Sequence, residues 1–332
     1  MGKATFRYTL SVVLLGSIYA SSFVATTHAM SYSSASSPSK SVLKGDASGT
    51  TASFATILDN QQPDGGWRKF YSEDHGDWAH SSIDNKATYT EIRRLAHQYT
   101  MTNNQAYADS AIKGIQFLLH MQYANGGFPQ IYHSSGYHTE ITYNDNAMTN
   151  VLLLLEDVGS QKGDFQFIDT GLAHQAKQAV HKGIECILNT QIVSNGKLTA
   201  WCQQYDATTL KPAGARAFEV PSITASESVG IVQLLKTRPA DARIQKSIQA
   251  AESWFKAVEI KHMDYQRNSK DSYVVADPYA SPIWARFYDI RTNRPIFVGR
   301  DGIVKYNLKD INQERRAGYA WYGSWPNKLG IH

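Results

Sequence analysis

Two stretches of the 332-residue sequence place an aspartate beside an asparagine at the start of a predicted helix. They are Asp84-Asn85 and Asn144-Asp145. Asp and Asn commonly cap helices, because their side-chain oxygens accept hydrogen bonds from the free amides of the first turn. Two such sites at equivalent places in successive repeats would instead bring oxygen ligands together, as Ca²⁺ requires. The pattern therefore predicts either two N-caps or a calcium site.

Arginines are the second group with chemical potential. Arg216 lies just before a helix that Pro221-Ser222 begins, at the same end as the two Asp-Asn sites. A surface salt bridge is the plain interpretation of Arg216, and a solvated basic tail is that of the C-terminal arginines. Guanidinium groups bind carboxylates bidentately, and aromatic rings stack on sugars, so a dense mixture of the two favours a carboxylated glycan. The mixture consists of Arg286, Arg291, Arg294, Arg300, Arg315 and Arg316 with Trp284, Phe287, Tyr288, Tyr319, Trp321, Tyr322 and Trp325.

The distribution of charge supports a local anion site. The chain has a formal net charge of +4, but the segment from Ser281 to His332 alone contains nine Lys or Arg against four Asp or Glu. A basic end on a nearly neutral body indicates a local anion-binding site rather than a nucleic-acid surface. We therefore expect no nucleic-acid partner.

A repeated motif predicts the elements that position these residues. Leu58, Leu119 and Leu188 are each followed three residues later by glutamine, then by a polar turn with glycine, then by apolar or aromatic residues. The turns centre near Gly65, Gly126 and Gly196, which are 61 and 70 residues apart.

Helical spacing precedes each turn and recurs between turns. Apolar residues fall on one face before the second and third turns, and residues 84–99, 145–158, 222–235 and 242–258 also read as helices. Two helices per period, repeated about three times, are typical of stacked helical hairpins. The predicted fold is all-α, an α/α toroid of about three hairpin repeats with long irregular loops and short strands.

The N-terminal residues resemble an export signal. Lys3 and Arg7 precede an apolar run, and Ala29 is a small residue at a suitable cleavage position. We predict a signal peptide at 1–29, a Ser-rich disordered linker at 30–48 and a catalytic domain at 49–332. The mature protein would then be secreted, extracellular or periplasmic, with no membrane partner; an uncleaved anchor is the alternative.

Cys186 and Cys202 are the two cysteines. Their spacing in an exported chain permits a disulfide, and two buried free thiols are the equal alternative.

Several long motifs together resemble one family. IDNKATYTEIRRLA, YNDNAMTNVL, WCQQYDATTLKP, AGARAFEVPSIT and PIWARFYDIRTNRPIFVGRDG look like the family 10 polysaccharide lyases, which are pectate lyases. The match runs from about Phe54 to the C-terminus. The resemblance implies a three-repeat α/α toroid and Ca²⁺-dependent cleavage of polygalacturonate.

The resemblance also implies roles for individual residues. Arg216 would be the base, Asp145 a Ca²⁺ ligand, and Asp84 a residue that positions metal and substrate. Substrate carboxylates would be held by Arg286, Arg300 and Arg315. The full predicted site adds Asn144 and Glu91 as metal ligands with Asp84 and Asp145, and Lys211, Asn85 and Tyr143 as substrate-binding residues. Ca²⁺ is the expected cofactor, polygalacturonate the substrate, and a monomer the working form.

The predicted chemistry is β-elimination, in which a base removes the proton on C5 of a uronate and the glycosidic oxygen leaves C4. Cations at the carboxylate stabilise the developing charge. Arginine is normally protonated, so only a small neutral fraction could act as the base. An acid/base hydrolase with Asp84 and Asp145 as its carboxylate pair and a non-catalytic pectin-binding protein are the alternatives. A triterpene cyclase is excluded because the sequence has no D-x-D-D run.

Overall fold

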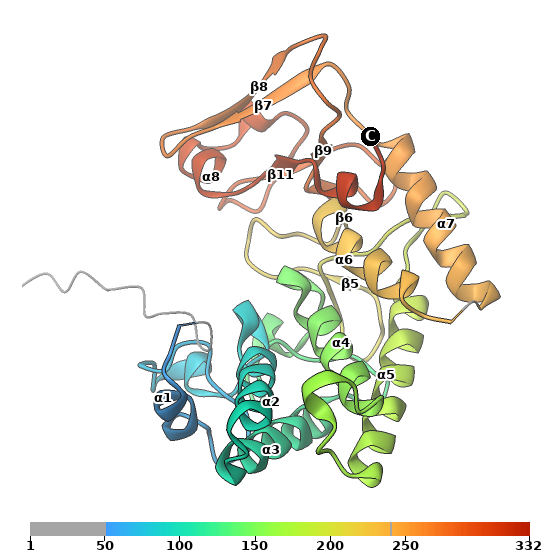
Figure 1. Ribbon diagram of the computed structural model, residues 1–332. Helices are drawn as coiled ribbons and strands as arrows, with labels where there is room; N and C mark the ends of the chain where they lie inside the picture. The colour runs from blue at the N-terminus through green and yellow to red at the C-terminus, as the bar shows by residue number, and fades with distance from the viewer. Residues whose placement is uncertain (1–50, 240) are drawn as a thin grey trace, which may run out of the picture. The chain divides into compact units, whose positions relative to one another are not determined.

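The computed structural model describes residues 51–239 and 241–332. The predicted signal peptide and Ser-rich linker lie outside these residues. Its main elements are helices joined by long loops and short strands (Figure 1). The helices are α1 (Phe54–Asp59), α2 (Tyr89–Thr102), α3 (Gln105–Met121), α4 (Ala147–Gly159), α5 (Thr170–Thr190), α6 (Ala225–Lys236), α7 (Ala242–Ala257) and α8 (Gln313–Gly318). None of the helices in the described ranges is both long and apolar enough to cross a bilayer.

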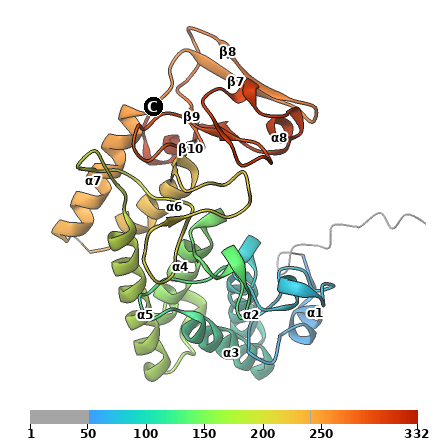
Figure 2. The same ribbon diagram turned by 180° about the vertical axis from the view of Figure 1, so that it is seen from behind.

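Three helix pairs form the body. α2 packs on α3, α4 on α5 and α6 on α7, and successive pairs meet through α2–α4–α6 and through α3–α5–α7. Figures 1 and 2, which view the chain from opposite sides, both place α4 and α5 between the other two pairs. The predicted stacked hairpins are therefore confirmed as a mostly helical array. Closure of this array into a toroid stays a prediction.

We call the first helix of each pair (α2, α4 and α6) the inner helix and the second (α3, α5 and α7) the outer helix. The two kinds of helix start differently. The outer helices α3, α5 and α7 begin after Asn104, Asp169 and Asp241, whose side chains accept hydrogen bonds from first-turn amides. The inner helices α2, α4 and α6 have no side-chain cap. α4 is the most apolar of them, and all of its central leucines and valines except the partly buried Leu153 are fully buried, as expected of a helix with neighbours on most sides.

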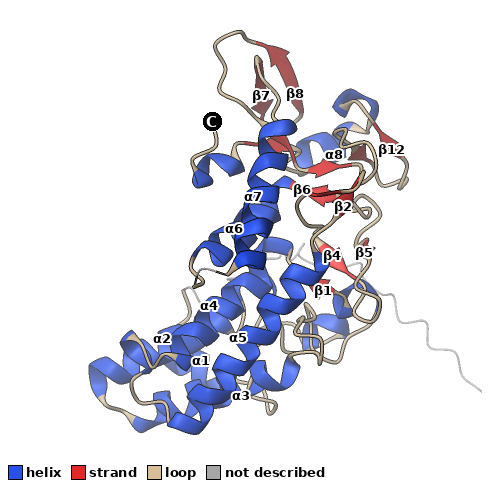
Figure 3. Cartoon of the chain, turned by 90° about the vertical axis from the view of Figure 1, so that its right-hand side faces the viewer, coloured by secondary structure: helices blue, strands red, loops and turns tan. Residues whose placement is uncertain are grey.

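Short strands and 3₁₀ turns occupy the long loops. Figure 3 shows β1, β2, β4, β5 and β6 along one side of the helices. The strands pair antiparallel as β1–β4–β5, β2–β3, β6–β10, β7–β8, β9–β13 and β11–β12. Their bounds are β1 (Ile141–Thr142), β2 (Val193–Ser194), β3 (Lys197–Leu198), β4 (Gln204–Tyr205), β5 (Pro212–Ala213), β6 (Ile223–Thr224), β7 (Met263–Arg267), β8 (Ser272–Ala276), β9 (Trp284–Ala285), β10 (Phe287–Tyr288), β11 (Phe297–Val298), β12 (Val304–Lys305) and β13 (Tyr322–Gly323). The 3₁₀ turns are η1 (Gly76–Ala79), η2 (Asp84–Lys86), η3 (Gly136–Thr139), η4 (Asn144–Asn146), η5 (Gly163–Phe165), η6 (Leu308–Asp310) and η7 (Trp325–Leu329).

The glutamine of the repeated motif joins neighbouring repeats. In every copy its side-chain amide donates to a carbonyl in or just after its own turn and to a carbonyl of the next outer helix. Gln61 donates to Gly65 and Ser110, Gln122 to Gly126 and Ala179, and Gln191 to Thr199 and Ser247, at 2.8–2.9 Å. One side chain thus fixes both the turn and the packing of the following pair.

The turn glycines allow this close approach. Gly65 and Gly126 have φ of +99° and +91°. A Cβ at Gly126 would lie 2.0 Å from the carbonyl oxygen of Lys182, and one at Gly65 would lie 2.5 Å from that of Lys113. Both turns therefore rest directly on the backbone of the next outer helix, α5 or α3.

A further copy of part of the motif, which the sequence analysis missed, follows α7. The indole N–H groups of Trp67, Trp201 and Trp284 each donate to a carbonyl at the end of the preceding helix region, at 2.8 Å. The sequence W-x-x-x-Y-D-x-x-T-x-x-P begins at both Trp201 and Trp284. In both, the aspartate accepts hydrogen bonds from the backbone and hydroxyl of the threonine three residues on.

Cys186 and Cys202 are buried free thiols, which resolves the alternative left open by their spacing. Cys202 directs its Sγ to the Ala213 carbonyl at 3.5 Å. Burial raises the pKa of Cys186 to about 11, so this thiol is an inert core residue.

We predict that Gly126→Ala destabilises the protein by about 3 kcal/mol or more, since it combines a left-handed backbone with overlap against α5. Gly136→Ala is the matched control, because Gly136 also has positive φ (+57°) but no atom within 4 Å of a Cβ. Its expected cost is about 1 kcal/mol. Urea unfolding of both variants measures the difference. Equal losses would show that the contact with Lys182 is unimportant.

Candidate active site

One cavity brings together five of the predicted residues. Asp84, Asn85, Asn144, Asp145 and Arg216 line a space of about 170 Å³. The other lining residues are Lys69, Trp78, Gln130, Tyr137, Gln203, Gln204, Ala215 and Glu219. The lining therefore comes from the loops around η2, η4 and β4–β5.

The two Asp-Asn pairs lie in 3₁₀ turns of matching conformation. Asn85 in η2 and Asp145 in η4 both have left-handed backbones, with φ of 45° and 50°. The backbone thus aligns Asn85 with Asp145 and Asp84 with Asn144. The two carboxylates therefore occupy different positions of the turn. None of these side chains caps the helix that follows, so the structure does not use them as N-caps.

Asp84 is already paired with a cation. Its carboxylate is 2.5 Å from the ammonium of Lys69, and the side chains are 3% and 13% exposed. The Lys69 ammonium also lies 4.4 Å from the centre of the Trp78 ring, within range of a cation–π interaction. Sequence reasoning missed Lys69 because its partner is fifteen residues away.

Asp145 carries the available charge of the cavity. It is exposed to solvent, and no ion-pair partner is found for it among the residues that the structure describes. Partial desolvation raises the pKa of Asp145, and the nearby charge of Glu227 raises it further, while Arg286 opposes both effects. A carboxylate in this setting would be stabilised by a cation.

The protein groups alone are too few for a tight metal site. Within the described ranges, no group of three or more His, Cys, Asp or Glu side chains could hold a metal ion. Asn144 offers an amide oxygen, but that oxygen accepts a hydrogen bond from Gln203. Asp145 with Asn144 has the right oxygen chemistry for Ca²⁺, provided that other ligands complete the coordination.

Glu219 holds Arg216 in a bidentate pair. Nε and Nη2 of Arg216 donate to the two carboxylate oxygens at 2.6 and 2.5 Å, and the Tyr319 hydroxyl donates to Oε1 at 2.8 Å. The Glu219 side chain is 4% exposed, whereas that of Arg216 is 50% exposed. These hydrogen bonds raise the pKa of Arg216 above its ordinary value. The guanidinium is therefore protonated in this arrangement.

The three arginines that were predicted to hold substrate carboxylates, Arg286, Arg300 and Arg315, do not line the cavity. Arg286 is 12% exposed and paired with Glu227, and its guanidinium is 4.9 Å from the Tyr319 ring. Arg315 is buried and lies 4.4 Å from the Phe218 ring. Arg300 is 64% exposed and pairs with Glu314 at 2.8 Å. These three residues form an arginine cluster in which each guanidinium already contacts a carboxylate.

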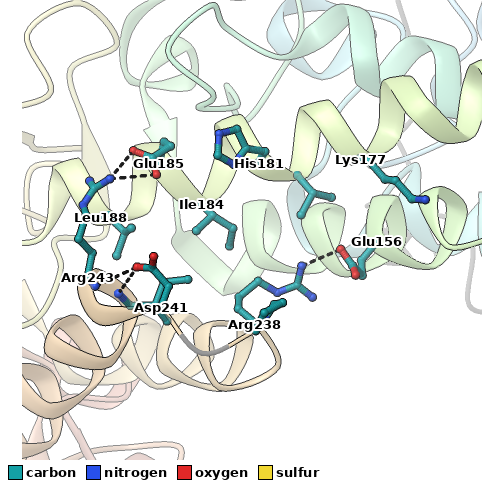
Figure 4. A pocket seen from close by; sticks show the side chains of 12 residues that line it. Glu156, Lys177, His181, Ile184, Glu185, Leu188, Arg238, Asp241 and Arg243 are labelled. Atoms are coloured by element: carbon teal, nitrogen blue, oxygen red, sulfur yellow. Dashed lines mark hydrogen bonds and ion pairs between the residues drawn. The ribbon is translucent and has the colours of Figure 1, made fainter.

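A larger cavity of about 550 Å³ lies between α4, α5 and the start of α7. Figure 4 shows two ion pairs among its charged side chains, Arg238 with Glu156 and Arg243 with Glu185. None of the predicted site residues lines it. Its charges are neutralised internally, so it offers less to an anionic ligand than the smaller cavity does.

The model of the pectic acid lyase family matches residues 72–330. The chain belongs to the pectic acid lyase family. Two similar solved structures are the family 10 polysaccharide lyase from Cellvibrio cellulosa and a mutant of it in complex with trigalacturonic acid. Both are 33% identical over 85% of this chain, covering 94% and 92% of theirs, with TM-scores of 0.76 and 0.77. No curated protein sequence matches.

Membership makes the enzyme a pectate lyase, which decides against the hydrolase and the non-catalytic binding protein. It also confirms the resemblance on which the sequence analysis relied.

Besides Arg286, Arg300 and Arg315, three more predicted residues do not line the cavity of this lyase. Glu91 on α2 is fully buried, and its carboxylate accepts a hydrogen bond from Tyr71. Tyr143 is also fully buried and hydrogen-bonds through its hydroxyl to Thr190 at 2.8 Å. Lys211 is exposed but does not line the cavity. In the structure, Glu91 and Tyr143 are core residues.

The buried Glu91 predicts a pH-dependent stability. Burial raises its pKa from 4.5 to about 7. In the unfolded chain Glu91 ionises above about pH 4.5 while the folded protein keeps it neutral, so the stability of the fold falls as pH rises from there to about 7. The expected loss is about 3 kcal/mol, and Glu91→Gln should abolish it.

Urea unfolding of the wild type and of Glu91→Gln across this pH range measures the effect. Added calcium should not alter the difference, because Glu91 lies away from the cavity. If calcium changes the difference in stability between the two proteins, Glu91 is a metal ligand after all.

Proposed function

We propose that this lyase is secreted and cleaves polygalacturonate by Ca²⁺-dependent β-elimination, with Arg216 as the base. The observation that carries the proposal is the cavity that Asp145 and Arg216 line together. A similar enzyme forms a complex with trigalacturonic acid, which supports a galacturonate chain as ligand here. Export through residues 1–29 and a monomeric working form belong to the same proposal.

Ca²⁺ would be held by Asp145 and Asn144 together with carboxylates of the bound chain. When bound, the ion would withdraw charge from the uronate carboxylate and so acidify the proton on C5. Asp84 is less suited to this role in the free protein, because Lys69 already neutralises it. A site of one protein carboxylate plus substrate explains why the described residues contain no complete metal cluster.

The arginine cluster would orient the substrate. Arg300 is exposed, and its present partner Glu314 is 52% exposed. An exposed pair of this kind contributes little to stability, so a substrate carboxylate could replace Glu314 at small cost. Arg286 and Arg315 are largely buried, and their role would be to set the electrostatic potential behind the substrate rather than to exchange partners.

Arg216 can act as the base only when Glu219 does not hold its proton. The bidentate pair favours the charged guanidinium, as its raised pKa shows. A cation bound beside Arg216 would disfavour that charge, whereas a carboxylate of the bound chain could draw the half-exposed guanidinium from Glu219. Even then the neutral fraction is small, and the rate should follow it as pH rises.

Calcium removal tests the first part of the proposal. We expect polygalacturonate to give the ultraviolet absorbance of an unsaturated product, and exhaustive chelation to abolish it. Asp145→Asn should lower the rate by about 100-fold or more at equal calcium, with partial recovery at high calcium. Asp109→Asn on α3, which is exposed and distant from the lining residues, is the control. Full activity of chelated enzyme would overturn the metal requirement.

The pH profile tests Arg216. Activity should rise with pH into the alkaline range until the fold fails, and Arg216→Ala should lower kcat by about 100-fold or more while oligogalacturonate still binds. Glu219→Gln removes the carboxylate that raises the Arg216 pKa, so the rising limb should move to lower pH. The measured quantity is the pH at which activity rises, because the maximal activity also depends on where Arg216 is placed. If the rise in activity stays at the same pH in Glu219→Gln and Arg216→Lys remains active, Arg216 only binds a substrate carboxylate and is not the base.

A further inference from the structure

Lys69 is placed to decide what the Asp84 carboxylate can bind. It follows the first turn of the repeat and reaches across the cavity wall to Asp84, with its ammonium 2.5 Å from Oδ2. The rings of Trp78 and Phe70 lie 4.4 and 5.2 Å from the ammonium. The side chain is 13% exposed. The Lys69 ammonium is therefore fixed in place by its neighbours, unlike that of a mobile surface lysine.

The two carboxylates of the cavity differ in this respect. Asp84 is buried and paired, whereas Asp145 is exposed, with no ion pair found among the described residues. Arg216 is matched by Glu219, and Arg286 by Glu227. The charge left over for an incoming cation is therefore that of Asp145.

We propose that Lys69 is the resident counter-cation of Asp84 and prevents the free enzyme from binding calcium tightly. The inference rests on the proposed calcium requirement. Without Lys69, Asp84 and Asp145 would together present two negative charges to a divalent ion. With Lys69 in place, calcium meets one carboxylate and a nearby ammonium that repels it.

Calcium binding then depends on the substrate. A galacturonate chain brings its own carboxylates, which supply the oxygen ligands that the protein lacks. Metal and chain would each bind weakly alone and more tightly together, as linkage requires. A neutral or fully esterified chain could not recruit the ion. Lys69 would thus be a positioning residue that contributes to specificity for the ionised polysaccharide.

Calorimetric titration of the free protein with calcium chloride tests the inference without reference to activity. Wild type should bind with a dissociation constant of about 1 mM or weaker, and Lys69→Gln should bind about tenfold tighter or more. Lys86→Gln is the matched control, since Lys86 is an exposed lysine two residues from Asp84 and lies outside the cavity lining. It should change the affinity much less. In Lys69→Gln/Asp84→Asn the gain should disappear, because it acts through Asp84.

A second measurement stands even if Lys69→Gln fails to fold. Arg216→Ala is expected to bind oligogalacturonate without turning it over, and its calcium affinity should rise about tenfold or more with saturating trigalacturonate. Tight calcium binding by the free wild type, or an unchanged affinity in Lys69→Gln, would overturn the role of Lys69. An equal gain in Lys86→Gln would do the same. Absence of unsaturated product from wild type would instead overturn the proposed lyase reaction, so the two failures are distinguishable.

Discussion

The amide of one glutamine per repeat is the interaction on which the fold depends. Gln61, Gln122 and Gln191 each donate to their own turn and to the next outer helix. One planar amide group thus joins two carbonyls that are far apart in the sequence. A leucine or alanine at such a position would remove both hydrogen bonds, at a cost of about 1 kcal/mol for each. The geometry of one repeat is therefore transmitted to the next.

The position of the candidate active site also depends on hydrogen bonds between neighbouring repeats. After each turn, the backbone amides of Ser82, Thr142 and Thr224 donate to the carbonyls of Trp67, Phe128 and Trp201, respectively. The chain thus arrives at η2, η4 and β6 in the same way. The amides of Ile83 and Tyr143 then donate to Gln130 and Gln203, each in the loop of the following repeat. The loops that carry Asp84, Asp145 and Arg216 are in this way tied across repeats, and the cavity forms where they meet.

The sequence predicted the helices well, because they depend on local patterns, and five of the predicted site residues line one cavity. Helical periodicity marks α2, α4, α6 and α7, and a turn with glycine marks the end of a helix. The face toward which a side chain points was harder to predict. Glu91 lies in the first turn of α2, shortly after the turn that contains Asp84, yet its side chain is in the core beside Tyr71. Lys69 and Glu227 were missed because their partners, Asp84 and Arg286, are 15 and 59 residues away. The one-residue offset between Asp84 and Asp145 was also invisible, since the left-handed backbone, not the residue type, defines the equivalent positions.

Each buried carboxylate near the cavity has its own cation. Asp84 pairs with Lys69, Glu219 with Arg216 and Glu227 with Arg286. Taking two charges out of water is costly, and replacing a buried pair with apolar residues is often neutral or stabilising. Stability alone therefore does not explain three such pairs around one cavity. Fixed charges and dipoles that are in place before reaction can stabilise charge that develops in the transition state without reorganising. In a lyase the developing charge lies on the uronate carboxylate, next to the carbon that loses its proton. If the chain binds in this cavity as we propose, the pairs would hold the positive groups in position near that carboxylate, and Asp145, which lacks such a pair among the described residues, would be left to bind one more cation.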